Sequence, residues 1–147
     1  MKLYLSFFIA ILFHFQSFAG SPLNGYKYVY VPDLSKKGTE QEIISEYTKK
    51  FFREKGLQII SSLEKARSLG ADSCLLLKTN FEYDPSGYRT TVVIRLRNCN
   101  KESIYFDEGS TANVYTKFEA AQKATEEALD GLNKRYKFDS SKSVKPE

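Results

Sequence analysis

The middle of the chain alternates between apolar and polar residues on both sides of a turn, and this pattern constrains the fold most. Residues 74–83 and 88–99 flank Asp84-Pro85-Ser86-Gly87, a sequence typical of a tight hairpin loop. With Tyr83 opposite Tyr88, successive side chains alternate between an apolar face and a polar face. This pattern predicts an antiparallel sheet that is covered on one side only. The apolar face would hold Leu75, Leu77, Phe81, Val92, Ile94 and Leu96, and the polar face Lys78, Asn80, Glu82, Val93, Arg95 and Arg97.

The remaining segments alternate between strand and helix patterns around this hairpin. Strands are indicated by β-branched and aromatic residues between turn residues, and helices by apolar residues at helical spacing. In chain order we expect a strand at 25–31, a helix at 39–56, a strand at 57–60, a short helix at 62–69, the hairpin, a strand at 103–112 and a helix at 116–136. The predicted fold class is α+β, a two-layer sandwich in which a twisted, mainly antiparallel sheet of about five strands carries both long helices on one face.

Each long helix is predicted to begin at a capping box, which pairs a threonine with a glutamate three residues later. The first box is Thr39 with Glu42, and the second is Thr116 with Glu119. The expected inward residues are Ile43, Ile44, Tyr47, Phe51 and Phe52 in the first helix, and Phe118, Ala121, Thr125, Ala128, Leu129, Leu132 and Tyr136 in the second. The alanines favour close approach of the second helix to its neighbour.

The two ends of the chain differ in character from this domain. A charged start, an apolar run from Leu3 to Phe15 and a small-residue site ending at Ala19 indicate a signal peptide at 1–19. The apolar run is shorter than the roughly 20 residues of a membrane-spanning helix. No cysteine follows the cleavage site directly, so we expect a protein released into the periplasm or the medium. Residues 20–136 form the predicted single domain, and the polar segment 137–147 is expected to be a disordered tail.

The residues left after cleavage argue against several classes of function. His14 is the only histidine in the chain, so the cleaved protein could build neither a Ser-His-Asp nor a Cys-His catalytic site. The two cysteines alone do not supply the four ligands of a structural zinc site. The net charge of +4, or +3 once Lys2 is removed, is too small to indicate a nucleic-acid-binding protein. We therefore predict no catalytic residues, no metal and no cofactor.

Three groups of residues are candidates for a structural or binding role. Cys74 and Cys99 could form a disulfide across the hairpin, but with Tyr83 opposite Tyr88 they lie diagonally, so a bulge or bent strand end is required; the alternative is two thiols. A stripe of tyrosines on one strand could be a binding surface or could pack under neighbouring side chains, and we favour packing. A basic patch could meet an acidic partner, or the peptidoglycan or lipid head groups of an envelope, or it could be a solvated face on which Glu82 lies beside Arg89. The tyrosines are Tyr26, Tyr28 and Tyr30, and the basic residues are Lys78, Arg95 and Arg97.

The order of elements resembles a group of small bacterial envelope domains. The segments 56–60, 69–72 and 98–104, together with the alanine-rich last helix, are similar to domains related to the TolB amino-terminal domain. The Tyr-Lys-Tyr-Val start at Tyr26 and the Asn-Cys-Asn turn around Cys99 resemble uncharacterised exported proteins of Bacteroidota. The resemblance implies a periplasmic accessory domain that binds proteins. This chain lacks a lipidated cysteine, so the resemblance does not extend to an outer-membrane tether.

These observations favour a non-catalytic exported accessory domain of the cell envelope whose partner is another protein. Two alternatives remain open. One is a cell-wall hydrolase that uses two carboxylates, with Asp72 and Glu82 as the residues to test. The other is a carrier that holds a small apolar ligand between the helices and the sheet.

Overall fold

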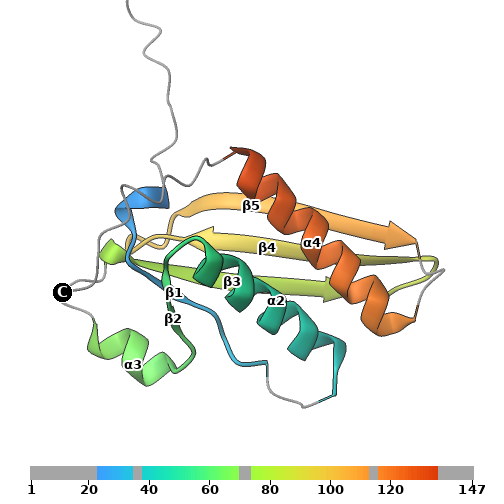
Figure 1. Ribbon diagram of the computed structural model, residues 1–147, viewed down its shortest axis with the longest axis horizontal. Coiled ribbons are helices and arrows are strands. Elements are labelled where there is room, and N and C mark those ends of the chain that lie inside the picture. The colour runs from blue at the N-terminus through green and yellow to red at the C-terminus, as the bar shows by residue number, and fades with distance from the viewer. Residues whose placement is uncertain (1–22, 35–37, 70–73, 113–115, 136–147) are drawn as a thin grey trace, which may run out of the picture.

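The computed structural model describes residues 23–34, 38–69, 74–112 and 116–135, which form one α+β domain (Figure 1). The predicted signal peptide at 1–19 and the predicted tail at 137–147 lie outside these residues, as do Asp72, His14 and Tyr136. A short 3₁₀ turn at Leu23–Gly25 leads into the first strand. None of the described helices is long and apolar enough to cross a membrane.

A five-stranded mixed sheet forms one layer of the domain, with the strand order β2-β1-β3-β4-β5. The short strands β1 (Tyr28–Tyr30) and β2 (Gln58–Ile60) pair in parallel, and β1 also runs parallel to β3 (Leu76–Asp84). The long strands β3, β4 (Arg89–Arg97) and β5 (Ser103–Ala112) pair antiparallel. The sheet is therefore antiparallel over most of its length and parallel at one end.

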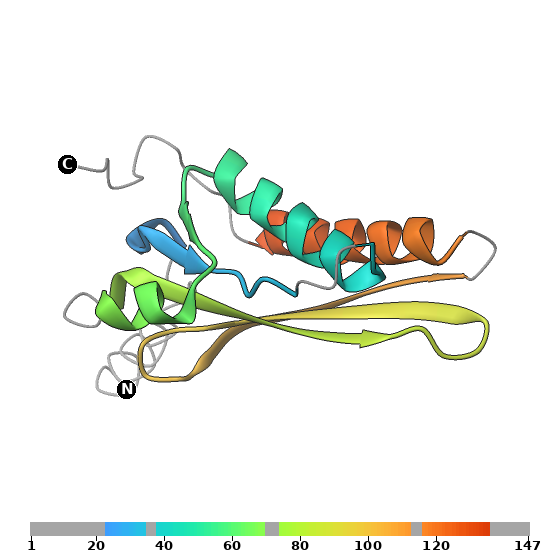
Figure 2. The ribbon, with the colours of Figure 1, turned by 90° about the horizontal axis from the view of Figure 1, so that it is seen from below.

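Two long helices, α2 (Glu40–Glu54) and α4 (Lys117–Arg135), lie side by side on one face of the sheet (Figure 2). The short helix α3 (Leu63–Ser68) lies on the opposite face, at the β2 end. The prediction of a two-layer sandwich with both long helices on one face is confirmed.

The predicted pairing within the hairpin is wrong by four residues. Tyr83 lies opposite Val92, and not opposite Tyr88, which is 93% exposed at the tip of the loop. The turn is centred two residues later than expected, on Gly87 and Tyr88. The Arg89 N–H donates to the Ser86 carbonyl, the Asp84 carboxylate accepts a hydrogen bond from the Ser86 N–H, and Gly87 takes a left-handed conformation with φ of 62°. A shift by an even number of residues keeps every side chain on its face, so the predicted apolar and polar faces survive the correction.

Only one of the two predicted capping boxes forms fully. At α4 the Thr116 hydroxyl accepts from the Glu119 N–H, and the Glu119 carboxylate accepts from the Thr116 N–H at 3.0 Å. At α2 Thr39 is the N-cap residue, but its side chain makes no capping hydrogen bond. The Glu42 carboxylate accepts instead from the N–H of Gly38, one residue further back.

The main core lies between the sheet and the two long helices, and α4 approaches the sheet most closely. Its buried residues are Ala120, Ala121, Ala124, Thr125, Ala128, Leu129 and Leu132. Phe118, which was expected to point inward, is 45% exposed because it lies in the first turn, ahead of the buried stripe. In α2, Ile44, Thr48 and Phe52 are fully buried, whereas Ile43, Tyr47 and Phe51 are only half-buried on the flank of the helix.

Candidate functional site

The outward side of β3, β4 and β5 is the largest part of the sheet that no described helix covers (Figure 2). Helices α2 and α4 pack on the other side, and α3 reaches only the end formed by β2 and β1. We call this surface the open face. It is made of Lys78, Asn80, Glu82 and Asp84 from β3, Arg89, Thr91, Val93, Arg95 and Arg97 from β4, and Phe106, Glu108, Ser110 and Ala112 from β5.

The register brings the three predicted basic residues together on the open face. Lys78 lies directly opposite Arg97, and Arg95 follows one row further along. Directly opposite residues in an antiparallel pair have Cβ atoms about 5 Å apart. Within the described residues no acidic side chain forms an ion pair with Lys78 or Arg97. The predicted basic patch is therefore a contiguous surface.

Arg95 is held in place by two contacts that the sequence did not reveal. Its Nη2 atom lies 2.9 Å from Glu82 Oε1, and its guanidinium lies 4.9 Å from the ring centroid of Phe106. The expectation that Glu82 lies beside Arg89 is wrong, because the four-residue shift places Glu82 next to Arg95. Phe106 is 46% exposed, so an aromatic ring and a guanidinium are presented together from rigid strands.

The three tyrosines do not form one bare stripe. Tyr28 and Tyr30 are half-buried and pack against the small apolar cluster under α3, formed by Ile60, Ala66 and Leu76. Tyr26 packs against the main core, and burial, with Glu102 adding to it, raises the pKa of its phenol. Tyr30 pairs with Lys78 across β1 and β3, so it borders the open face.

The predicted disulfide between Cys74 and Cys99 is present, with the two Cα atoms 4.8 Å apart. Cys74 precedes β3 and Cys99 follows β4, so both cysteines lie beyond the ends of their strands, at the end of the sheet where the ladder between β4 and β5 shifts register between Leu96 and Arg97. Asn98 stabilises the adjoining turn by accepting hydrogen bonds from the N–H groups of Asn100 and Glu102. The basic end of the open face is thus covalently fixed.

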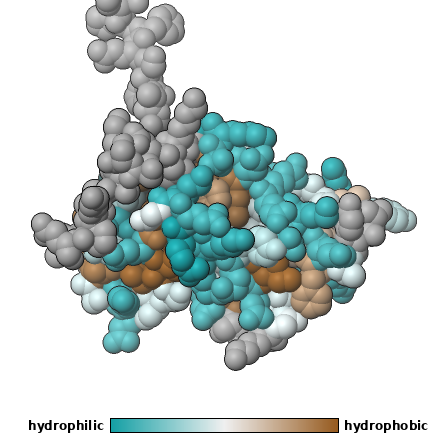
Figure 3. All heavy atoms as spheres, in the orientation of Figure 1, coloured by the Kyte–Doolittle hydropathy of each residue, from teal (hydrophilic) through white to brown (hydrophobic). Residues whose placement is uncertain are grey.

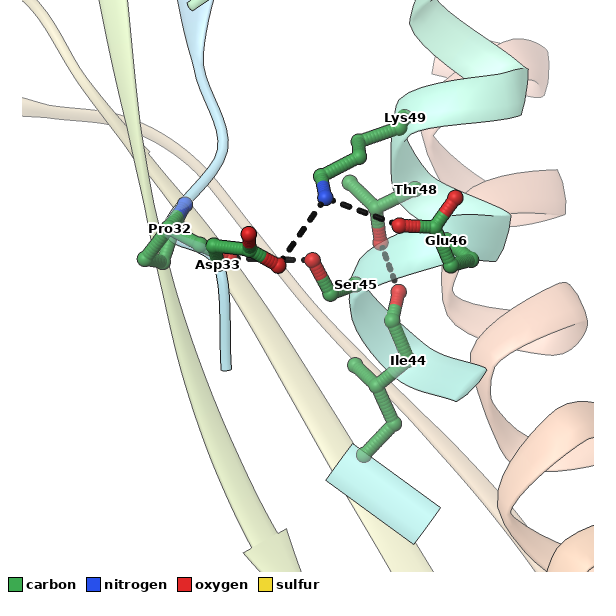
Figure 4. Close-up of polar contacts among 7 residues, drawn as sticks. All are labelled: Pro32, Asp33, Ile44, Ser45, Glu46, Thr48 and Lys49. Carbon is green, nitrogen blue, oxygen red and sulfur yellow. Dashed lines mark hydrogen bonds and ion pairs between the residues drawn. The ribbon is translucent and has the colours of Figure 1, made fainter. Parts of the chain in front are cut away.

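A polar cluster around Lys49, which sequence reasoning missed, joins α2 to the segment after β1 (Figure 4). The Lys49 ammonium lies 2.8 Å from Glu46 and 3.3 Å from Asp33, and its side chain is only 9% exposed. Ser45, fully buried, donates its hydroxyl to the Pro32 carbonyl. The signal was helical spacing, since Ser45 and Lys49 lie one turn apart beside the buried stripe of α2.

The polar cluster around Lys49 has a structural role. Burial alone would lower the pKa of Lys49, but its hydrogen bonds to Glu46 and Asp33 outweigh burial and raise that pKa. Lys49 is therefore protonated near neutral pH and does not act as a general base toward Ser45. Among the described residues, no group of three or more His, Cys, Asp or Glu side chains could hold a metal ion.

A shallow groove of about 270 Å³ runs between α2 and α4 on the opposite side of the molecule. Tyr47, Phe51 and Leu129 supply its apolar lining, and charged or polar residues surround them. This side of the domain is largely hydrophilic, with separate apolar patches (Figure 3). The polar lining residues are Lys50, Glu54, Glu126, Asp130 and Asn133.

Comparison with known proteins relates this chain to others through its fold. No protein-family model matches the sequence, and no curated protein matches it. Two crystal structures of PelC from Paraburkholderia phytofirmans, both described as dodecamers, match with a TM-score of 0.51. The fold is similar to that of PelC.

Sequence identity to PelC is low. The first structure, of a single-substitution variant, is 16% identical and covers 77% of this chain and 93% of the PelC chain. The second, in another crystal form, is 11% identical and covers 86% of this chain and 94% of the PelC chain. At this identity the likeness extends to the fold alone. The resemblance to TolB-related domains and to exported Bacteroidota proteins stays a prediction.

Proposed function

We propose that this chain is a non-catalytic accessory domain, exported to the periplasm or the medium, that works by binding a protein of the cell envelope through the open face. The observation that carries the proposal is the stacked pair of Arg95 and Phe106 on the uncovered side of three rigid strands. Arginine is among the residues that contribute most often to binding hot spots, and phenylalanine is enriched at protein interfaces. A guanidinium already held by Glu82 loses little freedom when a partner binds.

The charges beside this pair indicate the chemistry of the partner. Lys78 and Arg97 lie next to each other, and no described acid pairs with either. An acidic segment on the partner would neutralise both residues and would be steered toward them. The partner's complementary surface is therefore expected to be acidic at one end and to offer an apolar contact to Phe106.

Two further observations support an exported binding domain. Disulfides persist in oxidising compartments and are rare in the cytoplasm, and the chain contains one between Cys74 and Cys99. The PelC structures that share the fold are dodecamers, so a domain of this shape can present contact surfaces to other proteins. The carboxylate hydrolase is less well supported, because Glu82 is engaged by Arg95.

Site-specific photo-crosslinking in the native host tests the proposal. A photoreactive residue replaces Phe106, and in a matched control it replaces Lys117, which is exposed on the helix layer. We expect position 106 to yield a discrete crosslinked protein that position 117 does not yield. The crosslink should be lost when Lys78→Glu and Arg97→Glu are added. Equal crosslinking from both positions, or none from position 106, would refute binding through the open face.

The groove between α2 and α4 favours a second candidate function, the carriage of a small ligand. Tyr47, Phe51 and Leu129 make its lining partly apolar, and its volume of about 270 Å³ approaches that of small-molecule sites. Native mass spectrometry of the protein recovered from its host would show an added mass for a carrier. The Leu129→Glu variant should lose that mass, and absence of any added mass from the parent protein would argue against this function.

A further inference from the structure

We propose that the open face binds a second copy of this chain, packed face to face in an antiparallel, two-fold symmetric arrangement. This inference rests on the proposed function, because it names the occupant of the same surface. It follows from the order of charges along the strands, which makes the open face complementary to itself.

The charges change sign along the direction of β3. Side chains on one face of a strand recur every second residue, about 6.7 Å apart, so the ladder divides the open face into rows. Four of these rows are Lys78 with Arg97; Asn80 with Arg95 and Phe106; Glu82 with Val93 and Glu108; and Asp84 with Thr91 and Ser110. The first two rows carry only positive formal charges, and the third and fourth carry only negative ones. A fifth row next to the hairpin loop, Arg89 with Ala112, adds one positive charge beyond Asp84.

A two-fold axis that lies in the interface, parallel to the sheet and across the strands, between the second and third rows, brings opposite charges together. The row of Lys78 and Arg97 then lies over the partner copy's row with Asp84, and the row of Arg95 lies over the row with Glu82 and Glu108. A two-fold interface uses the same patch on both copies, so each such contact occurs twice. Packing the copies in the same direction would place like charges over each other, which favours the antiparallel arrangement.

The apolar residues of the open face lie next to this axis. Val93 is 9% exposed and Phe106 is 46% exposed, and they belong to the two central rows. Their position gives the interface an apolar centre with charges at both ends. Protein interfaces generally have this organisation, with a desolvated centre and a polar rim.

The edge of the sheet is a poorer route to self-association. β5 is an edge strand, and an unpaired edge can add a strand from another chain. Two of its N–H groups are already engaged by carboxylates, since Glu108 donates to Asp107 and Ser110 donates to Glu127 of α4. The edge is therefore blocked along part of its length, whereas the open face is uncovered.

The size of the open face predicts a weak dimer that depends on salt. Four rows on three strands span about 27 Å by about 14 Å, roughly 400 Å² of flat sheet before side chains are counted. Stable interfaces bury about 800 Å² on each partner. Because the complementarity is electrostatic, the dimer should weaken as the Debye length falls from about 30 Å at 0.01 M salt to about 10 Å at 0.1 M salt.

Sedimentation equilibrium of the protein recovered from its host tests the inference. The parent protein should form dimers at low salt, with a dissociation constant that rises at least about tenfold at 0.5 M salt. Two charge-reversed variants, Lys78→Glu with Arg97→Glu and Asp84→Lys, should each dimerise at least about tenfold more weakly than the parent. An equal mixture of the two variants should recover association, because the two substituted rows then lie over each other with opposite charges.

A control variant, Arg53→Glu with Lys117→Glu, makes the same change of charge on the helix layer as Lys78→Glu with Arg97→Glu makes on the open face, and it should dimerise like the parent. A monomeric parent at all concentrations and salts would overturn the inference, as would a mixture that associates no better than either variant alone. In either case a crosslink from position 106 to a different protein would leave the proposed function standing. Dimers that persist in both reversed variants would also overturn the inference, because another surface would then hold the copies together.

Discussion

Gly109 is the position where the structure makes its sharpest prediction about stability. It lies on the inner side of β5, where α4 passes directly over the strand. A Cβ atom at this position would overlap the carbonyl oxygen of Ala124 and approach the amide nitrogen of Ala128. Both atoms belong to the helix backbone, so no change of rotamer relieves the overlap. The Gly109→Ala variant must therefore move α4 away from the sheet.

The expected loss of folding free energy in Gly109→Ala can be judged by comparison with substitutions that overpack a core. Inserting methyl groups into a packed core typically costs about 1–3 kcal/mol, and side chains absorb part of the strain. Here the helix itself must shift, so Gly109→Ala should lower the free energy of unfolding by about 3 kcal/mol. Gly131→Ala is the informative contrast, because its Cβ meets the Asp107 carboxylate, a side chain that can turn away. Alanine also gains about 1 kcal/mol in helix propensity there, so we expect a cost below about 1 kcal/mol.

Urea unfolding followed by circular dichroism measures both variants. With a slope of about 2 kcal/mol per M, a loss of about 3 kcal/mol lowers the midpoint by about 1.5 M. Ser110→Ala, one residue away on the open face, serves as the control and should shift the midpoint little. A Gly109→Ala protein as stable as the parent, or one no less stable than Gly131→Ala, would refute the reasoning that α4 is seated on this glycine.

Three further predictions concern other parts of the fold. Replacing Cys74 and Cys99 by serine opens a loop with a sequence separation of 25 and should cost about 3.5 kcal/mol, measured by urea unfolding. Lys49→Met should cost no more than about 1 kcal/mol in the same assay, because Asp33 is largely exposed and can be rehydrated. Hydrogen bonds from Thr116 lower the pKa of Glu119. The contribution of the ionised carboxylate to the free energy of unfolding is therefore present above pH 4.5 and is lost as the pH falls through that lowered pKa. Glu119→Gln should flatten the dependence of stability on pH over this acidic range, measured by thermal unfolding at each pH.

The sequence predicted the faces of the hairpin but not its register, and the reason is geometric. Side-chain direction in a strand has period two, so any even shift keeps Ile94 inward and Arg95 outward. The register depends on the turn, which hydrogen bonds around Asp84 and Ser86 and a left-handed Gly87 centre two residues later in the chain. Such local contacts compete with a tighter pairing by small energies that residue types alone do not resolve.

Helical spacing gave the buried side of both long helices to within one turn. It missed Lys49, since a lysine is placed on the solvent side by default. A lysine can lie at a buried position when carboxylates from the same helix and from a neighbouring segment meet its ammonium, as Glu46 and Asp33 do. Phe118 was misplaced for the opposite reason, because an apolar residue in a first turn can extend beyond the layer that its helix covers.

The candidate site was predictable in part, because side-chain direction in a strand has period two. Lys78, Arg95 and Arg97 share one parity, so the sequence could place them on one face, and the structure shows them as neighbours. Phe106 was not among the predicted site residues, because its position depends on the ladder between β4 and β5, which shifts register between Leu96 and Arg97. A usable signal was present, since Tyr105 and Phe106 must point to opposite faces and only one of them can enter the core.

The irregular end of the sheet is what gives the open face its order of charges. The register shift at Arg97 and the disulfide at Cys99 lie together where β4 turns into β5, and they fix the first row of the open face. From that fixed row, the pairing of β3 with β4 sets Arg95 beside Glu82 and separates the basic rows from the acidic ones. Rigid strands hold these charges at constant spacing, so a matching surface loses little entropy in meeting them. Loss of the disulfide should therefore weaken binding at the open face more than it weakens any contact made by the helix layer.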